Sequence, residues 1–123
     1  MIADSNRLIY AARPADETVC RWLIAELPAV SAISLVEVLG YDRFQPGERE
    51  ALEEVFQLLE VIYPGPETFR IAVGLRQRRP MSLGDSLIAA RALEHNERLA
   101  THNTEDFAGI EGLDLFDPVP RQA

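Results

Sequence analysis

The sequence predicts an α/β domain in which a mainly parallel sheet is covered by helices on both faces. Two observations favour this class. Short apolar runs, suited to buried strands, alternate along the chain with longer segments whose apolar residues recur at helical spacing. Acidic residues also occur where several of the helices are expected to begin. At 123 residues we expect one domain over residues 1–123, large enough for a real core.

The expected strands are short and apolar. Ile2 and Ala3 form the first, and the Pro-Gly-Pro cluster after Tyr63 ends the third. The full set of expected strands covers residues 2–3, 30–33, 61–63, 98–101 and 113–116.

The expected helices carry apolar residues on one side. In the segment 15–27, Val19, Leu23 and Leu27 recur at helical spacing, and Pro28 ends the helix. Ser34 and Ser82 are expected to cap the helices that they open. The full set of expected helices covers a short segment around residues 8–10 and residues 15–27, 34–40, 46–59, 67–78 and 82–96.

The chain is acidic and contains no lysine. Its formal net charge is -8, and all 12 basic residues are arginine. This charge argues against broad nonspecific binding to nucleic acid, so any such contact must be local or supplied by a partner. The absence of lysine excludes P-loop nucleotidases, Schiff-base enzymes and phosphoacceptor receiver domains, which need a lysine at a fixed place.

The sequence also indicates a cellular location. No apolar run approaches the length of a membrane span, and no secretion signal precedes the domain. Cys20 is the single cysteine, so it cannot form an internal disulfide. We therefore expect a cytoplasmic protein that has no membrane partner.

Four short motifs place a carboxylate where a helix is expected to begin. They are Asp4-Ser5-Asn6, Ser34-x-x-Glu37, Ser82-x-x-Asp85 and Thr101-x-Asn103-x-x-Asp106. The carboxyl ends of parallel strands share one edge of a sheet, so acids far apart in the sequence would converge there. Clustered carboxylates repel one another unless a cation neutralises them, and oxygen ligands select hard ions such as Mg²⁺ or Mn²⁺. The motifs therefore indicate a metal-dependent site that cleaves phosphodiester bonds.

A purely structural interpretation of the same motifs is the alternative. Ser34-x-x-Glu37 and Ser82-x-x-Asp85 match the capping box, in which the acid bonds back to the backbone of the cap residue. Taken singly, each acid is better explained as a cap. Asp4 has no capping-box partner, however, and four acids at one predicted edge favour a functional site. The two interpretations are compatible, because a helix N-terminus stabilises a carboxylate and fixes its direction.

Longer segments around these motifs carry a family resemblance. The segments are MIADSNRLIY at 1–10, ISLVEVLG at 33–40, GDSLIAARAL at 84–93 and LATHNTEDF at 99–107. In this order, over almost the whole chain, they resemble the PIN-domain ribonucleases of the VapC toxin type, which occur in bacterial toxin–antitoxin pairs. The resemblance implies a PIN-like three-layer α/β fold with a central, mainly parallel sheet.

The resemblance also implies roles for individual residues. The acidic quartet around Mg²⁺ or Mn²⁺ would be Asp4, Glu37, Asp85 and Asp106. Residues that orient ligands or a water molecule would be Ser5, Asn6, Thr101 and Asn103. Asn103 and Glu105 are alternatives for the fourth position, where Asp106 is favoured because Phe107 can pack and fix the segment. The metal would lower the pKa of a water molecule that attacks phosphorus.

Arg76, Arg78 and Arg79 form the basic cluster of the sequence, just before the Asp85 segment. One interpretation is a solvated helix end that complements the helix dipole. The other is a rim that binds the phosphates of RNA, for which the arginine fork is well suited.

The resemblance further implies an RNA substrate, a homodimer and a cognate VapB-like antitoxin that presents an apolar helix and an arginine competing with the metal. Part of a set of apolar residues should form the exposed protein interface. This set is Leu8, Tyr10, Trp22, Leu39, Tyr41 and Phe44. The main alternative function is a PIN-like binding module without cleavage, but the presence of all four acids favours the enzyme. An unrelated α/β phosphatase is disfavoured, because its nucleophile and lysine pattern are missing.

Overall fold

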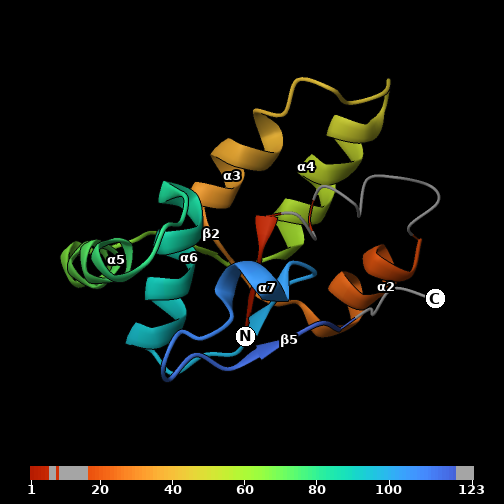
Figure 1. Ribbon diagram of the computed structural model, residues 1–123. Coiled ribbons are helices and arrows are strands. Elements are labelled where there is room, and N and C mark those ends of the chain that lie inside the picture. Colours follow the sequence, from red (N-terminus) through yellow and green to blue (C-terminus); the bar gives the residue numbers. More distant parts are fainter. Residues whose placement is uncertain (6–7, 9–16, 119–123) are drawn as a thin grey trace.

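A five-stranded, fully parallel sheet lies at the centre of the residues that the structure describes. This structure is a computed structural model that describes residues 1–5, 8 and 17–118 (Figure 1). The strands are β1 (Ile2–Ala3), β2 (Ala29–Ser31), β3 (Val61–Ile62), β4 (Leu99–Ala100) and β5 (Leu115–Phe116). The helices are α2 (Glu17–Glu26), α3 (Ala32–Leu39), α4 (Glu48–Leu58), α5 (Pro66–Arg78), α6 (Leu83–Glu94) and α7 (Thr104–Phe107). The predicted parallel α/β class is confirmed.

The order of the strands brings the predicted functional segments together. The sheet runs β3-β2-β1-β4-β5, so β1 is central and pairs with β2 on one side and β4 on the other. Ala3 is aligned with both Val30 and Ala100. The chain segments that leave these three strands therefore start from neighbouring points on the carboxyl edge of the sheet.

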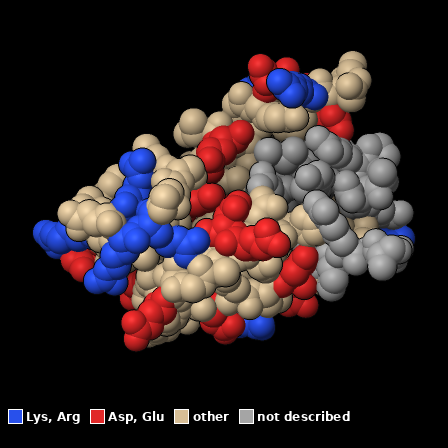
Figure 2. Space-filling model, in the orientation of Figure 1, with Lys and Arg blue, Asp and Glu red and all other residues tan. Residues whose placement is uncertain are grey.

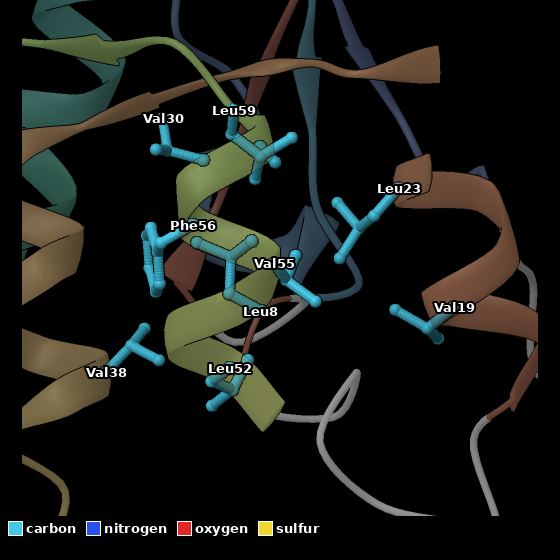
Figure 3. Packing of buried hydrophobic residues seen from close by; sticks show 10 residues of the cluster. Leu8, Val19, Leu23, Val30, Val38, Leu52, Val55, Phe56 and Leu59 are labelled. Atoms are coloured by element: carbon cyan, nitrogen blue, oxygen red, sulfur yellow. The ribbon is translucent and has the colours of Figure 1, made fainter. Parts of the chain in front are cut away.

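Helices cover both faces of the sheet, because successive side chains of a strand point to opposite sides. Ala3 faces a core that α2, α3 and α4 share, whereas its neighbour Ile2 faces a core that α5, α6 and α7 share. Figure 3 shows the first core, in which Leu52 and Phe56 of α4 point inward with the other side chains of the cluster. The result is the three-layer arrangement expected from the sequence.

One predicted boundary is wrong, and it concerns a functional motif. The strand expected at 30–33 ends at Ser31, whose side chain caps α3 by accepting a hydrogen bond from the backbone N–H of Ile33 (3.2 Å). Ser34 is therefore inside the first turn of α3 and is not its cap. A short apolar run fits a strand and a buried helix equally well, so its pattern could not locate this boundary.

The other elements lie close to their predicted positions. Ser82 caps α6 as expected, and its hydroxyl accepts a hydrogen bond from the N–H of Asp85 (3.1 Å). Leu8 is fully buried in a helical segment, whereas Ile9, Tyr10 and residues 15–16 lie outside the described residues. Among the helices in the described ranges, none has the length and apolar character that crossing a membrane requires.

The apolar residues that were expected to divide between core and interface differ in burial. Leu8 is buried, and Trp22, Leu39 and Phe44 pack against the first core, while Tyr41 makes an edge-to-face contact with Phe44 (5.1 Å between ring centroids). Trp22, Leu39, Tyr41 and Phe44 are half-buried and Tyr10 lies outside the described residues, so the interface formed by part of this set stays a prediction. Among the described residues, the large apolar side chains that are at least half exposed are Ile24, Leu27, Val36, Leu58, Tyr63, Phe69, Val73 and Leu83.

Candidate active site

The carboxyl edge of the sheet gathers the four predicted acids. Asp4 follows β1, Glu37 is on α3, Asp85 is in the first turn of α6, and Asp106 is on α7. The charges of Asp85 and Glu37 both act on Asp4, and those of Asp106 and Glu37 both act on Asp85. Figure 2 shows acidic side chains gathered in the middle of this face, with a group of basic side chains beside them.

Asp4 is the most deeply buried of the four acids, with 3% of its surface exposed. The hydroxyl of Thr101 donates to its Oδ2 (2.9 Å), and the backbone N–H of Ser5 donates to its Oδ1 (2.7 Å). Burial raises the pKa of Asp4 to about 6, and repulsion from Asp85 and Glu37 adds to this, although the two hydrogen bonds act in the opposite direction. The site therefore favours added positive charge at this carboxylate.

Asp85 combines the two roles that the sequence left open. The Ser82 hydroxyl accepts its backbone N–H, so this segment does cap α6. Burial raises the pKa of the Asp85 carboxyl, a side-chain hydrogen bond with Ser82 lowers it, and the charges of Asp106 and Glu37 raise it. The helix cap thus holds the Asp85 carboxylate at a place where the charges of Asp106 and Glu37 act on it.

Glu37 is held by a chain of hydroxyl groups instead of a capping box. Ser5 Oγ donates to Glu37 Oε1 (2.8 Å) and also lies 2.8 Å from Ser34 Oγ. Because Ser5 has one hydroxyl hydrogen and gives it to Glu37, Ser34 must donate to Ser5. Ser34 is therefore a site residue whose role the sequence analysis misassigned. The signal that could have found it is the spacing of three residues between Ser34 and Glu37, which puts both side chains on one face of a helix.

The last acid is on α7, and the supporting residues lie around it. Asp106 is the α7 carboxylate whose charge raises the pKa of Asp85, which favours it over Glu105 and Asn103 for the fourth position. Asn103 begins α7 and donates its backbone N–H to Thr101 Oγ1 (3.0 Å), and its side chain makes no cap hydrogen bond. Asn6 lies outside the described residues.

The three arginines of the basic cluster differ in their contacts. Arg79 Nη2 donates to the backbone carbonyl of Asp106 (3.1 Å), and its Nη1 donates to the carbonyl of Ala108. Arg76 Nε donates to the carbonyl of Met81 (3.1 Å), while Arg78 is exposed at the end of α5. Arg79 therefore joins α5 to the Asp106 segment, a contact between distant residues that no sequence pattern indicated.

The donor atoms of the site suit a hard divalent cation. The four carboxylates and the nearby hydroxyls offer only oxygen, and repulsion among the carboxylates adds to the burial that raises the pKa of Asp4 and of Asp85. Within the described part of the chain, no three acidic, histidine or cysteine side chains already lie close enough to hold one ion. Ligation thus requires side-chain rotation, which is open to an exposed residue such as Asp106.

Fold and site together define a parallel α/β domain with an acidic cluster at the carboxyl edge of its sheet. The chain belongs to the PIN domain family, whose family model matches residues 1–113. The predicted family resemblance is thereby confirmed. A comparison with the curated proteins found no match.

Solved structures with the same fold come from toxin–antitoxin systems. A chain of the toxin–antitoxin complex from Klebsiella pneumoniae is 28% identical, with 98% of each chain covered and a TM-score of 0.75. A chain of VapBC-1 from nontypeable Haemophilus influenzae is 26% identical, with 94% and 96% covered and a TM-score of 0.73. A chain of VapBC2 from Rickettsia felis, solved with a promoter DNA fragment, is 23% identical, with 94% and 96% covered and a TM-score of 0.78.

Proposed function

We propose that this protein is a metal-dependent endoribonuclease that acts as the toxin of a toxin–antitoxin pair. The observation that carries the proposal is the convergence of four carboxylates at one edge of a PIN-domain sheet. A binding module without cleavage would not need an acid as buried as Asp4 beside other carboxylates that repel it, an arrangement that destabilises the fold. The presence of the full acidic set therefore favours the enzyme over that alternative.

The residues that would hold Mg²⁺ or Mn²⁺ are Asp4, Glu37, Asp85 and Asp106. When bound, the ion supplies positive charge to the phosphodiester and acidifies a water molecule for attack on phosphorus. The chain itself orients the ligands. Thr101 and the backbone of Ser5 hold the two oxygens of Asp4, and the Ser5 hydroxyl holds Glu37. Such fixed ligands reduce the rearrangement that is needed during reaction.

An RNA substrate must approach an acidic protein, so its contacts have to be local. Arg76 and Arg78, on the last turn of α5, are basic side chains close to the Asp85 segment, and we assign them to phosphate binding. Arg79 was predicted for the same role. Because its guanidinium already donates to two backbone carbonyls, we assign it instead to holding the Asp106 segment in place.

Two protein partners follow from the same assignment. The similar structures are toxin–antitoxin complexes, and we propose that a cognate antitoxin inhibits this chain by directing a basic side chain at the acidic cluster. A second copy of the chain would pack on α5 and α6, where Phe69, Val73 and Leu83 are at least half exposed and line a groove of about 310 Å³. Sedimentation tests the dimer, and a monomer at micromolar concentration would contradict it.

The proposed activity is tested with purified protein and a mixture of structured RNAs. We expect internal cleavage that requires Mg²⁺ or Mn²⁺, that stops on addition of a chelator, and that is absent in the Asp4→Asn variant. Equal cleavage by wild type and variant would point to a contaminating nuclease and overturn the assignment. Co-expression with the product of the adjoining gene tests the antitoxin, since a cognate antitoxin should restore growth and co-purify.

A further inference from the structure

The Glu37 carboxylate occupies the space that a side chain at position 84 would need. A Cβ atom added to Gly84 would lie 2.6 Å from Glu37 Oε2, 2.9 Å from Cδ and 3.0 Å from Oε1. These distances are too short for non-bonded contact, so any residue other than glycine would displace the carboxylate. Ser5 holds the same carboxylate through Oε1 (2.8 Å), so Glu37 is confined between the Ser5 hydroxyl and the first turn of α6.

We propose that Gly84 is a positioning residue that brings the Glu37 and Asp85 carboxylates together for a shared cation. The inference rests on the proposed metal-dependent function and concerns one ligand of that site. Gly84 directly precedes Asp85, so a carboxylate packed against its Cα lies beside the next residue in the chain.

A structural role alone does not explain a glycine at this position. Gly84 is the second residue of α6, and glycine is less favourable than alanine in a helix. The atoms that an added methyl would meet belong to the end of a flexible glutamate side chain, not to backbone. We therefore expect Gly84→Ala to leave α6 intact and to move Glu37, which would break its hydrogen bond with Ser5.

The test compares Gly84→Ala with Gly74→Ala in the full chain. Gly74 is inside α5, and a Cβ there would meet nothing within 4 Å, so its substitution reports the helix effect alone. We expect both variants to keep or raise the melting temperature. Only Gly84→Ala should weaken Mn²⁺ binding, measured by calorimetry, and slow RNA cleavage, each by about 10- to 100-fold, as expected for a ligand displaced by about 1 Å.

A Glu37→Ala background shows whether Gly84 influences Mn²⁺ binding through Glu37. If Gly84 acts through Glu37, adding Gly84→Ala to Glu37→Ala should change Mn²⁺ affinity no further, because the displaced group is already absent. Additive losses would overturn the proposal. Wild-type Mn²⁺ affinity in Gly84→Ala would overturn the proposal too. So would unfolding of that variant, because the added methyl group would then have disrupted α6 instead of moving Glu37.

Failure of the proposed function can be recognised separately. If wild-type protein neither binds Mn²⁺ nor cleaves RNA, the metal-dependent function is wrong. The positioning role is then decided by the side-chain carboxyl ¹³C resonance of Glu37 in metal-free protein. A shift in Gly84→Ala and none in Gly74→Ala supports it, and an unchanged resonance in both overturns it.

Discussion

The faces of the sheet and its carboxyl edge use the same strands for opposite purposes. Ile2, Ala3 and Val30 are fully buried in the two cores, and their burial stabilises the fold. One residue further along, Asp4 is almost as deeply buried, but it carries a carboxyl whose pKa is raised to about 6. Burial of the apolar faces therefore offsets the cost of gathering carboxylates at the edge of the sheet. Stability and function should respond differently to changes in these two regions.

The largest expected effect is the loss of cleavage at the edge without loss of the fold. Asp85→Asn should lower RNA cleavage by about 10³-fold or more, because one carboxylate of a shared cation site is removed. The melting temperature of the metal-free protein should stay level or rise, since repulsion among the acids is relieved. Asp114→Asn, at an exposed acid paired with Arg98, is the matched control and should cleave like wild type. Retained cleavage in Asp85→Asn would reject its role.

The opposite result is expected on the apolar faces. Leu52 of α4 is fully buried in the first core (Figure 3), and Leu52→Ala should destabilise the fold by about 2–5 kcal/mol through lost burial and a cavity. Urea unfolding measures this loss. The fraction that remains folded should cleave RNA at the wild-type rate. A specific loss of activity beyond the folded fraction would mean that core and edge are not separable.

The pH dependence of stability provides a third contrast. An exposed aspartate has a pKa of 3.8, whereas Asp4 in the fold titrates at about 6. Between these values the folded protein binds more protons than the unfolded chain, so its free energy of unfolding falls as the pH rises. The total loss is about 3 kcal/mol between about pH 4 and pH 6. Denaturation of metal-free protein across this range should show the fall in wild type and a flatter profile in Asp4→Asn. Equal profiles would contradict the burial argument for Asp4.

The smallest effects should separate two arginines at the C-terminal end of α5, Arg78 and Arg79. Arg79→Ala removes the donors to the Asp106 and Ala108 carbonyls, so we expect a decrease in kcat of about tenfold with little change in KM. Arg78→Ala, at an exposed site, should instead raise KM and reduce the salt dependence of RNA binding. If both variants showed the same changes in kcat and KM, the separate roles assigned to Arg79 and Arg78 would be wrong.

The sequence predicted the class of fold because that class depends on local patterns, whereas the role of the four acids as metal ligands stays a prediction. Helical spacing, short apolar runs and a proline or a serine cap are properties of neighbouring residues, and the cap at Ser82 was found in this way. The boundary at Ser31 was missed because the apolar run around Ile33 fits a strand and a helix equally well.

Contacts between distant segments could not be predicted. Ser34 reaches Ser5 and Arg79 reaches α7 only in the folded chain, since 29 and 27 to 29 positions separate these partners in the sequence. The space for Glu37 at Gly84 is a meeting of α3 with α6, and an isolated glycine in a helical pattern does not reveal it. In the same way, the sequence could not show that Trp22 and Leu39 pack, half-buried, against the first core.

We propose that the carboxylates at the acidic edge lower the stability of the whole fold until a divalent cation binds among them. The most direct test is the melting temperature of the purified protein at pH 7.5 as a function of Mn²⁺ concentration, compared with that of Asp85→Asn. A ligand that binds only the folded state raises stability as its concentration exceeds the dissociation constant. We predict a saturable rise in wild type and a much smaller one in the variant. An equal rise in both proteins, or none in wild type at millimolar Mn²⁺, would contradict the account.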